Sequence, residues 1–254
     1  SITAAHKVYD GNNTASITSG AISTGVGSET LAISGSGTFS DANAADNKVV
    51  TVAQTSTLTQ TDGSGSWSNY RLTTAGPITT TANITRKDVS LSSITAAHKV
   101  YNGSDAAAIT TGVVLGTVGT ESLSVSGVGS FSDANAADGK TVSVTDVTAL
   151  TKANGSGNWS NSNLTTTGAM TTTANITRKD VSLSSITALD KVYDGNNTAT
   201  ITSGAISTGV SGETLAISGS GTFADANAAN GKTVTVDNVA ALTKANGTGN
   251  WDNY

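Results

Sequence analysis

The chain repeats itself at intervals of 92 residues, and this period limits what it can fold into more than any other feature. The recurring large aromatic residues fall in register: Tyr9, Tyr101 and Tyr193; Phe39, Phe131 and Phe223; Trp67, Trp159 and Trp251. Solenoid units are roughly 20 to 45 residues long, so a longer period indicates one small domain per copy. We therefore expect three domains, at residues 1–85, 86–177 and 178–254, with these aromatic rings mainly in their cores.

The domain boundaries are placed beside Arg86 and Arg178, because an alternating run ends at Ile84 and a charged stretch follows it. With this division the first domain lacks an opening strand, and the third lacks closing strands equivalent to residues 71–85. A sandwich without closing strands exposes unpaired backbone groups. We expect either that the sequence is cut from a longer array or that another copy donates the missing strands.

The residue pattern predicts strands and no helices. Residues 31–39 alternate between a core face, which carries Leu31 and Phe39, and a solvent face, and the pattern recurs at residues 123–131 and 215–223. Further strands are expected at residues 7–9, 15–22, 48–52, 71–74, 78–84 and 89–94. This spacing predicts an all-β fold, a tandem array of antiparallel β-sandwich domains. Gly35 and Gly37 leave a groove on the core face, and we expect Trp67 to lie over it.

The composition excludes several classes of partner and chemistry. The formal net charge is −5 and the basic residues are scattered, which argues against nucleic acid. The chain has no cysteine, which excludes disulfides and zinc–thiolate sites. No apolar run approaches the roughly 18 residues of a membrane helix, so we expect no membrane insertion in this segment.

Each copy closes a short strand with a Tyr-Asp-Gly or Tyr-Asn-Gly triplet. The turn positions are Asp10 and Gly11, Asn102 and Gly103, and Asp194 and Gly195. Asp and Asn share turn-forming hydrogen bonds and tolerance of left-handed backbone, whereas only Asp carries charge. The exchange of Asp for Asn therefore predicts a structural turn.

One loop offers weak candidates for a metal site. Asp41, Asn43 and Asp46 gather oxygen atoms of the kind that calcium prefers, but Asp46 is replaced by Asn230 in the third copy. A structured turn is the favoured interpretation and calcium is the alternative. We expect that the fold requires no metal and no cofactor.

No constellation of reactive residues recurs in all copies. His6 and His98 are replaced by Asp190 in the third copy, which disfavours a catalytic or metal-binding histidine and predicts exposed strand residues. We expect no enzymatic activity.

Two lysines and one glutamate do recur: Lys7, Lys99 and Lys191; Lys48, Lys140 and Lys232; Glu29, Glu121 and Glu213. Solvated strand-edge lysines and a turn glutamate are the ordinary interpretation. A lysine condensed with a neighbouring Asn or Asp side chain, stapling the domain covalently, is the alternative.

Several segments together resemble the YDG repeat over essentially each whole copy. They are the run Lys-Val-Tyr-Asp-Gly-Asn-Asn-Thr-Ala from Lys7, residues 39–46 and 48–52, Asn69-Tyr70 with Leu72, and residues 82–85. The second copy departs from the pattern at Asn102 and Ser162. The resemblance, which extends to the related mostly-bacterial Greek-key repeat, implies Greek-key β-domains. Such domains occur in tandem in very large secreted or surface proteins of bacteria, including filamentous-haemagglutinin-like adhesins.

The period and the resemblance together predict a structural extender, the stalk of a bacterial surface adhesin or extracellular filament that supports adhesion or biofilm matrix. Strands of about 10 residues make each unit roughly 35 to 40 Å long, so three units end to end would span about 110 to 120 Å. The expected partners are the neighbouring repeats of the same chain, with strand donation by other copies as an alternative. A different class of function is a glycan-binding module that uses the loops around Trp67, Trp159 and Trp251, and exposed tryptophans would favour it.

Overall fold

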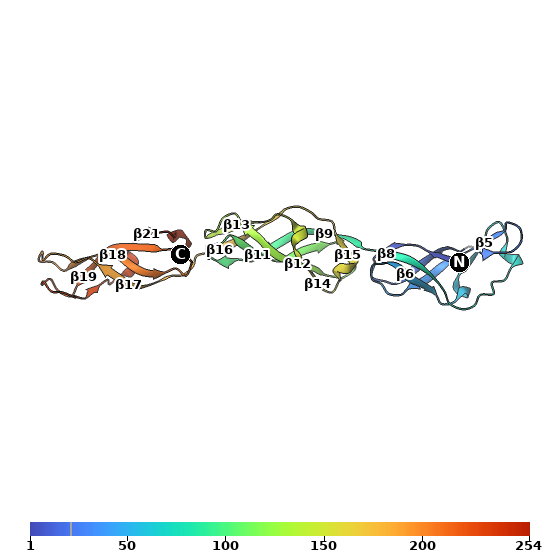
Figure 1. The fold of residues 1–254 in the computed structure, drawn as a ribbon, viewed down its shortest axis with the longest axis horizontal. Helices are drawn as coiled ribbons and strands as arrows, with labels where there is room; N and C mark the ends of the chain where they lie inside the picture. The colour runs from blue at the N-terminus through green and yellow to red at the C-terminus, as the bar shows by residue number, and fades with distance from the viewer. Residues whose placement is uncertain (21) are drawn as a thin grey trace. The chain divides into compact units, whose positions relative to one another are not determined.

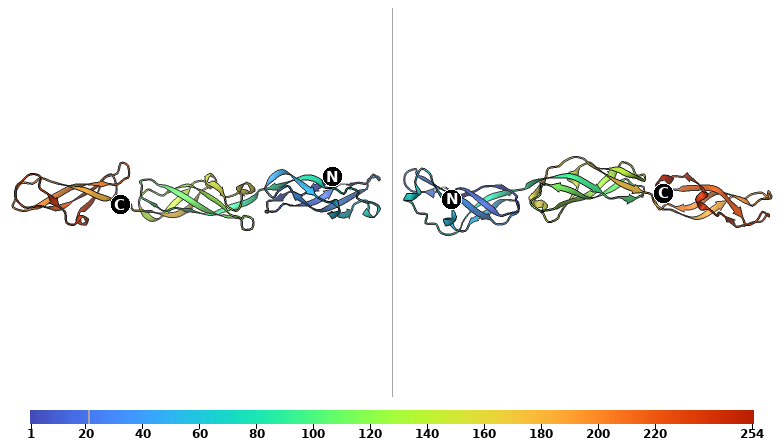
Figure 2. Two further views of the ribbon diagram at one scale, coloured as in Figure 1. Left: turned by 90° about the horizontal axis from the view of Figure 1, so that it is seen from below. Right: turned by 180° about the vertical axis from the view of Figure 1, so that it is seen from behind.

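A computed structural model describes residues 1–20 and 22–254 and is all-β apart from single turns of 3-10 helix (Figure 1). These residues divide into two compact units, one of residues 1–94, 111–127 and 146–169 and the other of residues 95–110, 128–145 and 170–254. The first unit holds the whole first copy with part of the second, and the second unit holds the remainder. Strands within each part curl around one another, as two further views show (Figure 2).

The first copy forms one curled sheet around a central strand. Its elements are β1 (Ile2–Ala4), β2 (Lys7–Val8), β3 (Thr14–Gly20), β4 (Ile22–Ser23), β5 (Thr30–Phe39), β6 (Ala45–Val52), η1 (Thr55–Thr57), β7 (Thr59–Asp62), η2 (Trp67–Asn69) and β8 (Ile78–Thr85). The strand order is β1-β3-β5-β6-β8-β2, and β4 and β7 also pair with β5. The first half of β5 pairs with β4 and β7 and its second half with β3 and β6, so this long strand lies at the centre of the sheet.

The second copy repeats these elements, and the third repeats most of them. The second contains β9 (Lys87–Ala96), β10 (Lys99–Val100), β11 (Ala106–Leu115), β12 (Leu123–Phe131), β13 (Ala137–Val144), η3 (Val147–Ala149), β14 (Thr151–Asn154), η4 (Trp159–Asn161), β15 (Ser162–Leu164) and β16 (Met170–Thr177). The third contains β17 (Ser182–Ala188), β18 (Thr198–Ser207), β19 (Leu215–Phe223), β20 (Val234–Thr235), η5 (Val239–Ala241), β21 (Thr243–Asn246) and η6 (Trp251–Asn253). Their sheets have the orders β10-β16-β13-β12-β11-β9-β15 and β17-β18-β19-β20, with β14 on β12 and β21 on β19.

The all-β prediction is confirmed, but the sheets of the first two copies are mixed, whereas the pairings of the third are antiparallel. Three short pairings are parallel: β2 with β8, β10 with β16, and β15 with β9. The strand expected at residues 71–74 is absent from the described first copy. Its equivalent in the second copy, β15, pairs with Lys87–Val89, and the corresponding partner positions of the first copy would precede Ser1.

The glycines of the central strand are covered by aliphatic side chains, so the expectation that Trp67 lies over them is wrong. A Cβ on Gly35 would lie 3.0 Å from Leu58 Cδ2, and one on Gly37 would lie 3.0 Å from Val50 Cγ1. Trp67 instead directs its indole N–H at the backbone of Ala32 and Thr61.

The core of the first copy is a cluster of aliphatic side chains around one phenylalanine and one tyrosine. In the first copy Ile17, Ile33, Phe39, Val50 and Ile84 belong to one buried cluster. The corresponding cluster of the third copy is smaller, with Ile201, Ile217 and Leu242 as its buried residues. The reason is the absence, in the described third copy, of a strand equivalent to β8 or β16.

Candidate functional site: the joints between repeats

The Tyr-Asp-Gly turn of one copy contacts the next copy along the chain. Tyr9 is buried, and its hydroxyl donates a hydrogen bond to the carboxylate of Glu121. Tyr101 is also buried, and it donates in the same way to Glu213. Each pair lies inside one of the two compact units. We call the contacts of residues 9–11 and 43–44 with residues 118–121 and 161 the first joint, and the equivalent contacts 92 residues later the second joint.

The glycine of the same turn packs against a valine of the next copy. Gly11 has a φ of 80°, and a Cβ added to it would lie 3.2 Å from Val118 Cγ1. At the second joint Gly103 has a φ of 77°, and its Cβ would lie 2.8 Å from Val210 Cγ1. Only glycine meets both requirements, because the left-handed backbone and the close approach each disfavour a side chain.

A buried asparagine completes each joint. Asn161 is 2% exposed; its Oδ1 accepts from the backbone N–H of Ala44 at 2.9 Å, and its Nδ2 donates to Asn43 Oδ1 at 3.0 Å. Asn253, also 2% exposed, makes the same two bonds to Ala136 and Asn135, at 2.8 and 3.1 Å. Both asparagines stand two residues after the recurring tryptophan, in a single turn of 3-10 helix.

The Asp or Asn of the triplet holds the turn that presents the tyrosine. Asp10, Asn102 and Asp194 each accept a bond at 3.1 Å from the backbone N–H two residues later. This bond needs an oxygen and no charge, in agreement with the exchange of Asp for Asn. The glycine that follows has positive φ in all three copies.

The second joint holds an additional tyrosine. Tyr254 donates to Glu213 Oε2 at 2.6 Å, and its ring meets the ring of Tyr101 edge to face, with centroids 5.4 Å apart. Burial and the bond to Glu213 raise the pKa of Tyr254 to about 12. They also raise the pKa of Tyr101, whereas the pKa of Tyr9 is raised first by its bond to Glu121 and then by burial. The second copy has Ser162 at the position of Tyr254, so the first joint is built without this ring.

A family model for the YDG domain matches residues 1–78, 85–174 and 177–254. The chain belongs to the YDG domain family. No curated protein matches the chain, and no solved structure matches it. The tyrosine, Asp or Asn, and glycine of the YDG triplet are thus the residues that form the turn and the joint described above.

The loop considered for calcium is held by bonds among its own residues and to the next repeat. Asp41 Oδ1 lies 2.6 Å from Lys48 Nζ and accepts from the N–H of Asn43 at 2.7 Å, and the bond to Lys48 lowers the pKa of Asp41. Asn43 Oδ1 is bonded to Asn161, and Asp46 is exposed on β6. In the described residues no three His, Cys, Asp or Glu side chains are grouped as a metal would require.

The recurring lysine of this loop forms an ion pair. Lys140 and Lys232 pair with Asp133 and Asp225 as Lys48 pairs with Asp41. The aspartate of each pair is about half exposed, and its lowered pKa is that of a carboxylate stabilised by a cation. The ion pair accounts for the recurrence of this lysine. Lys48 and Lys140 are buried, so the expectation that they are solvated is wrong for both.

Each YDG tryptophan clamps two strands of its own repeat. The indole N–H of Trp159 lies 3.1 Å from both the Ser124 and the Ala153 carbonyl oxygens, and the side chain is 9% exposed. Trp67 and Trp251 make the same pair of contacts and are half-buried. Lys152 Nζ lies 5.2 Å from the centroid of the Trp159 ring.

The other residues predicted for the cores divide by repeat. Phe39 and Phe131 are buried, whereas Phe223 is half-buried. Tyr193 was expected in a core but is 64% exposed, and that expectation is wrong. Tyr9 differs in that it belongs to the buried cluster of its own repeat, against which Val118 of the next repeat also packs, and in that it bonds to Glu121 of the next repeat.

Sequence reasoning did not assign the residues that contact the triplet of the preceding repeat, although it named the two glutamates as recurring. They are Glu121 and Glu213, Val118 and Val210, and Asn161 and Asn253. Each recurs at the period of the chain, together with Glu29, Val26 and Asn69 in the first copy. One signal was available in the sequence: a valine recurs in a glycine-rich turn, and an apolar side chain at such a position indicates that another part of the protein packs against it.

Proposed function

We propose that the YDG repeats are the extender region of a bacterial surface adhesin or extracellular filament, which holds an adhesive tip away from the cell or contributes to biofilm matrix. A secreted or cell-surface location, a kinship with filamentous-haemagglutinin-like adhesins and Greek-key connections belong to this proposal. Catalysis has no part in it.

The observation that carries the proposal is the recurrence of the joint. Both successive pairs of repeats are connected by the same three contacts at equivalent residues: tyrosine to glutamate, glycine to valine, and asparagine to the loop of the preceding repeat. A contact that is repeated at each step gives each added copy the same placement on its predecessor. Reach then grows with copy number and needs no new chemistry.

The placement of the tryptophans supports an extender rather than a glycan-binding module. Stacking on a sugar requires an open aromatic face. Trp159 is 9% exposed, its N–H is occupied by backbone, and Lys152 stands over its ring. These contacts stabilise the repeat and leave little of the Trp159 ring for a ligand, whereas Trp67 and Trp251 are half-buried.

Distances between equivalent exposed residues test the proposal. The chain has no cysteine, so single cysteines at Ser40, Ser132 and Ala224 can carry spin labels at equivalent positions. We expect the same narrow distance for the pairs 40/132 and 132/224 and roughly twice that distance for 40/224. A 40/224 distance no longer than 40/132 would refute an extender.

Location is tested separately, by protease treatment of intact bacteria that produce the protein. The repeats are expected to be cleaved from outside while a cytoplasmic marker stays intact. Protection of the repeats until the cells are broken would contradict the proposed surface location.

A further inference from the structure

Both loops that a repeat presents to the next repeat are organised around a lysine of the presenting repeat. In the first repeat these loops are the triplet turn, residues 9–12, and the asparagine loop, residues 41–44. Lys7 on β2 binds the triplet turn, and Lys48 on β6 binds the asparagine loop.

The ammonium of Lys7 binds three oxygen atoms of the triplet turn. Its Nζ lies 2.7 Å from Asp10 Oδ1, 2.8 Å from the carbonyl oxygen of Asn12 and 2.9 Å from Asn12 Oδ1. The same ammonium lies 5.7 Å from the centroid of the Phe39 ring. One cation on an aromatic face thus closes the turn that carries Tyr9 to the first joint.

The second repeat keeps this arrangement although it lacks the aspartate. Asn102 replaces it, and Lys99 Nζ donates to the backbone carbonyl oxygen of Ser104, the residue equivalent to Asn12. The ammonium again faces a ring, 5.3 Å from the centroid of Phe131. The feature that the two repeats share is therefore a cation bound to the same backbone oxygen of the turn, and an ion pair is not required.

Lys48 acts on the asparagine loop through Asp41. The Lys48 side chain is 7% exposed, and the carboxylate oxygen that it binds also accepts from the backbone N–H of Asn43. Asn43 in turn accepts a bond from the Asn161 side chain, so a continuous path of bonds leads from a buried ammonium to the next repeat. The same path at the second joint runs through Lys140, Asp133, Asn135 and Asn253.

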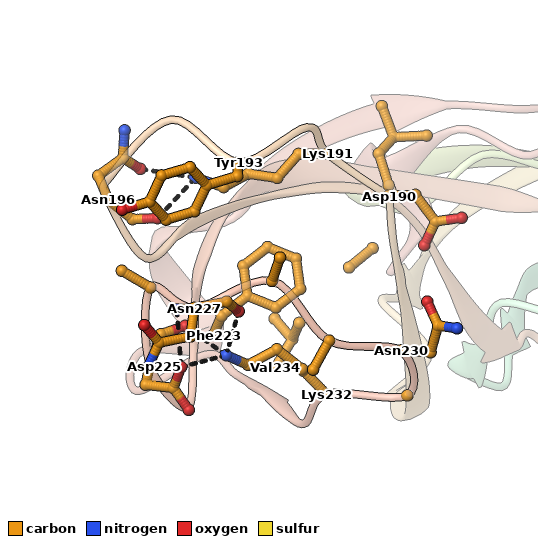
Figure 3. Close-up of a pocket in the computed structure, with 16 residues that line it drawn as sticks. Asp190, Lys191, Tyr193, Asn196, Phe223, Asp225, Asn227, Asn230, Lys232 and Val234 are labelled. Atoms are coloured by element: carbon orange, nitrogen blue, oxygen red, sulfur yellow. Dashed lines mark hydrogen bonds and ion pairs between the residues drawn. The ribbon is translucent and has the colours of Figure 1, made fainter.

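The third repeat shows that these bonds form without a joint. Its triplet turn faces open space, because Tyr193 is 64% exposed and a Cβ added to Gly195 would meet no described atom within 4 Å. Both lysines nevertheless keep their bonds (Figure 3), Lys191 to Asn196 and Lys232 to Asp225 and Asn227. The loops therefore keep their internal bonds whether or not a neighbouring repeat covers them.

We propose that Lys7 and Lys48, with their equivalents in each repeat, are positioning residues for the joint: built-in cations that fix two loops in the shape that the next repeat binds. The partner that this surface fits is a further YDG repeat, through the glutamate, valine and asparagine described above. Docking then orders no loop, so little conformational entropy is lost at each joint. The inference rests on the joints that carry the proposed function.

Hydrogen exchange on the receiving side of the joint tests this role in the 254-residue chain. The side-chain amide of Asn161 is buried and donates to Asn43, so its exchange reports opening of the first joint from the next repeat. Lys48→Met removes the ammonium and keeps an apolar chain of similar length. Exchange of the Asn161 amide is expected to become about tenfold faster, the lower end for loss of a hydrogen bond to a charged group. Lys7→Met is expected to act in the same direction through the triplet turn.

Two controls separate the joint from the fold of the repeat. Val50 is fully buried on β6, so its backbone amide reports unfolding of the first repeat itself. Its exchange in Lys48→Met should change about twofold or less, because an apolar side chain replaces a buried charge at little cost to the fold. Lys232→Met makes the same change in the third repeat and should leave the Asn161 amide within about twofold of its original rate.

Three outcomes would overturn the proposal. The first is an Asn161 amide that exchanges at its original rate in Lys48→Met. The second is equal acceleration of Asn161 and Val50, which would make the lysine a stabiliser of its own repeat only. The third is the same acceleration of Asn161 in Lys232→Met. The spin-label distances decide the extender function and these exchange rates decide the role of the lysines, so each can fail without the other.

Discussion

Removing one hydroxyl from the first joint gives the sharpest test of how the repeats are connected. Tyr9→Phe deletes the bond to Glu121 and leaves the ring in place. A hydrogen bond to a charged group contributes about 1.5 to 3 kcal/mol. Glu121 is half-buried and water can partly replace the hydroxyl, so we expect the lower end, about 1.5 kcal/mol, or roughly a tenfold rise in opening of the joint.

Hydrogen exchange of one backbone amide reports that opening directly. The N–H of Ala44 bonds across the joint to Asn161, so its exchange is expected to become about tenfold faster in Tyr9→Phe. Ala136, which makes the equivalent bond at the second joint, should keep its rate. Tyr193→Phe is the matched control, because Tyr193 is 64% exposed and its loss should change both rates less than twofold. Equal effects of Tyr9→Phe and Tyr193→Phe on Ala44 would refute the joint.

Three further perturbations distinguish the contacts across a joint from the local conformation of the turn. Gly103→Ala and Gly195→Ala both place a side chain at a φ near 80°, which lowers the free energy of unfolding by about 1 to 2 kcal/mol each. Only the Cβ at position 103 meets a valine across a joint, so urea unfolding should show a further loss of about 1 to 3 kcal/mol for Gly103→Ala. Asn161→Ala should cost about 1 to 3 kcal/mol by the same assay, against less than about 0.5 kcal/mol for its exposed equivalent in Asn69→Ala, and similar losses would contradict the assignment. Because the pKa of Tyr254 is raised to about 12, the stabilisation of the second joint by the protonated Tyr254 hydroxyl is complete below about pH 10 and is lost as the pH rises towards 12. The rise in phenolate absorbance should coincide with faster hydrogen exchange at Ala136. Exchange at Ala136 that does not respond to the ionisation would refute the coupling.

The sequence predicts the strands well wherever one face of a strand is buried. Residues 31–39 alternate in hydrophobicity, and β5 spans Thr30–Phe39. The strand β7, Thr59–Asp62, was missed because all four of its residues are exposed and polar. Its position depends on pairing with β5 and on the clamp made by Trp67, which are contacts between distant parts of the chain.

The turn in the YDG triplet was predictable and its partner was not. The exchange of Asp10 for Asn102 indicates a backbone-bonding side chain, and the structure places that bond in every repeat. The contact of Tyr9 with the next repeat could not be predicted, because a single sequence does not show which distant loops come together. From the sequence, the replacement of His6 and His98 by Asp190 argued only against a catalytic histidine. The structure shows that His6 and His98 each accept a hydrogen bond from the backbone of a neighbouring strand.

The serine at position 162 makes the two joints mechanically unequal. At the second joint, Glu213 accepts hydrogen bonds from the hydroxyls of Tyr101 and Tyr254, and the two rings are in contact. At the first joint, Glu121 accepts a hydrogen bond from Tyr9, and Ser162 stands at the position of the second ring. When elements in series share one pulling force, the weakest yields first. Under tension the first joint is therefore expected to open before the second. The residue at this one position of each copy, serine or tyrosine, thus sets the order in which the joints between these repeats open.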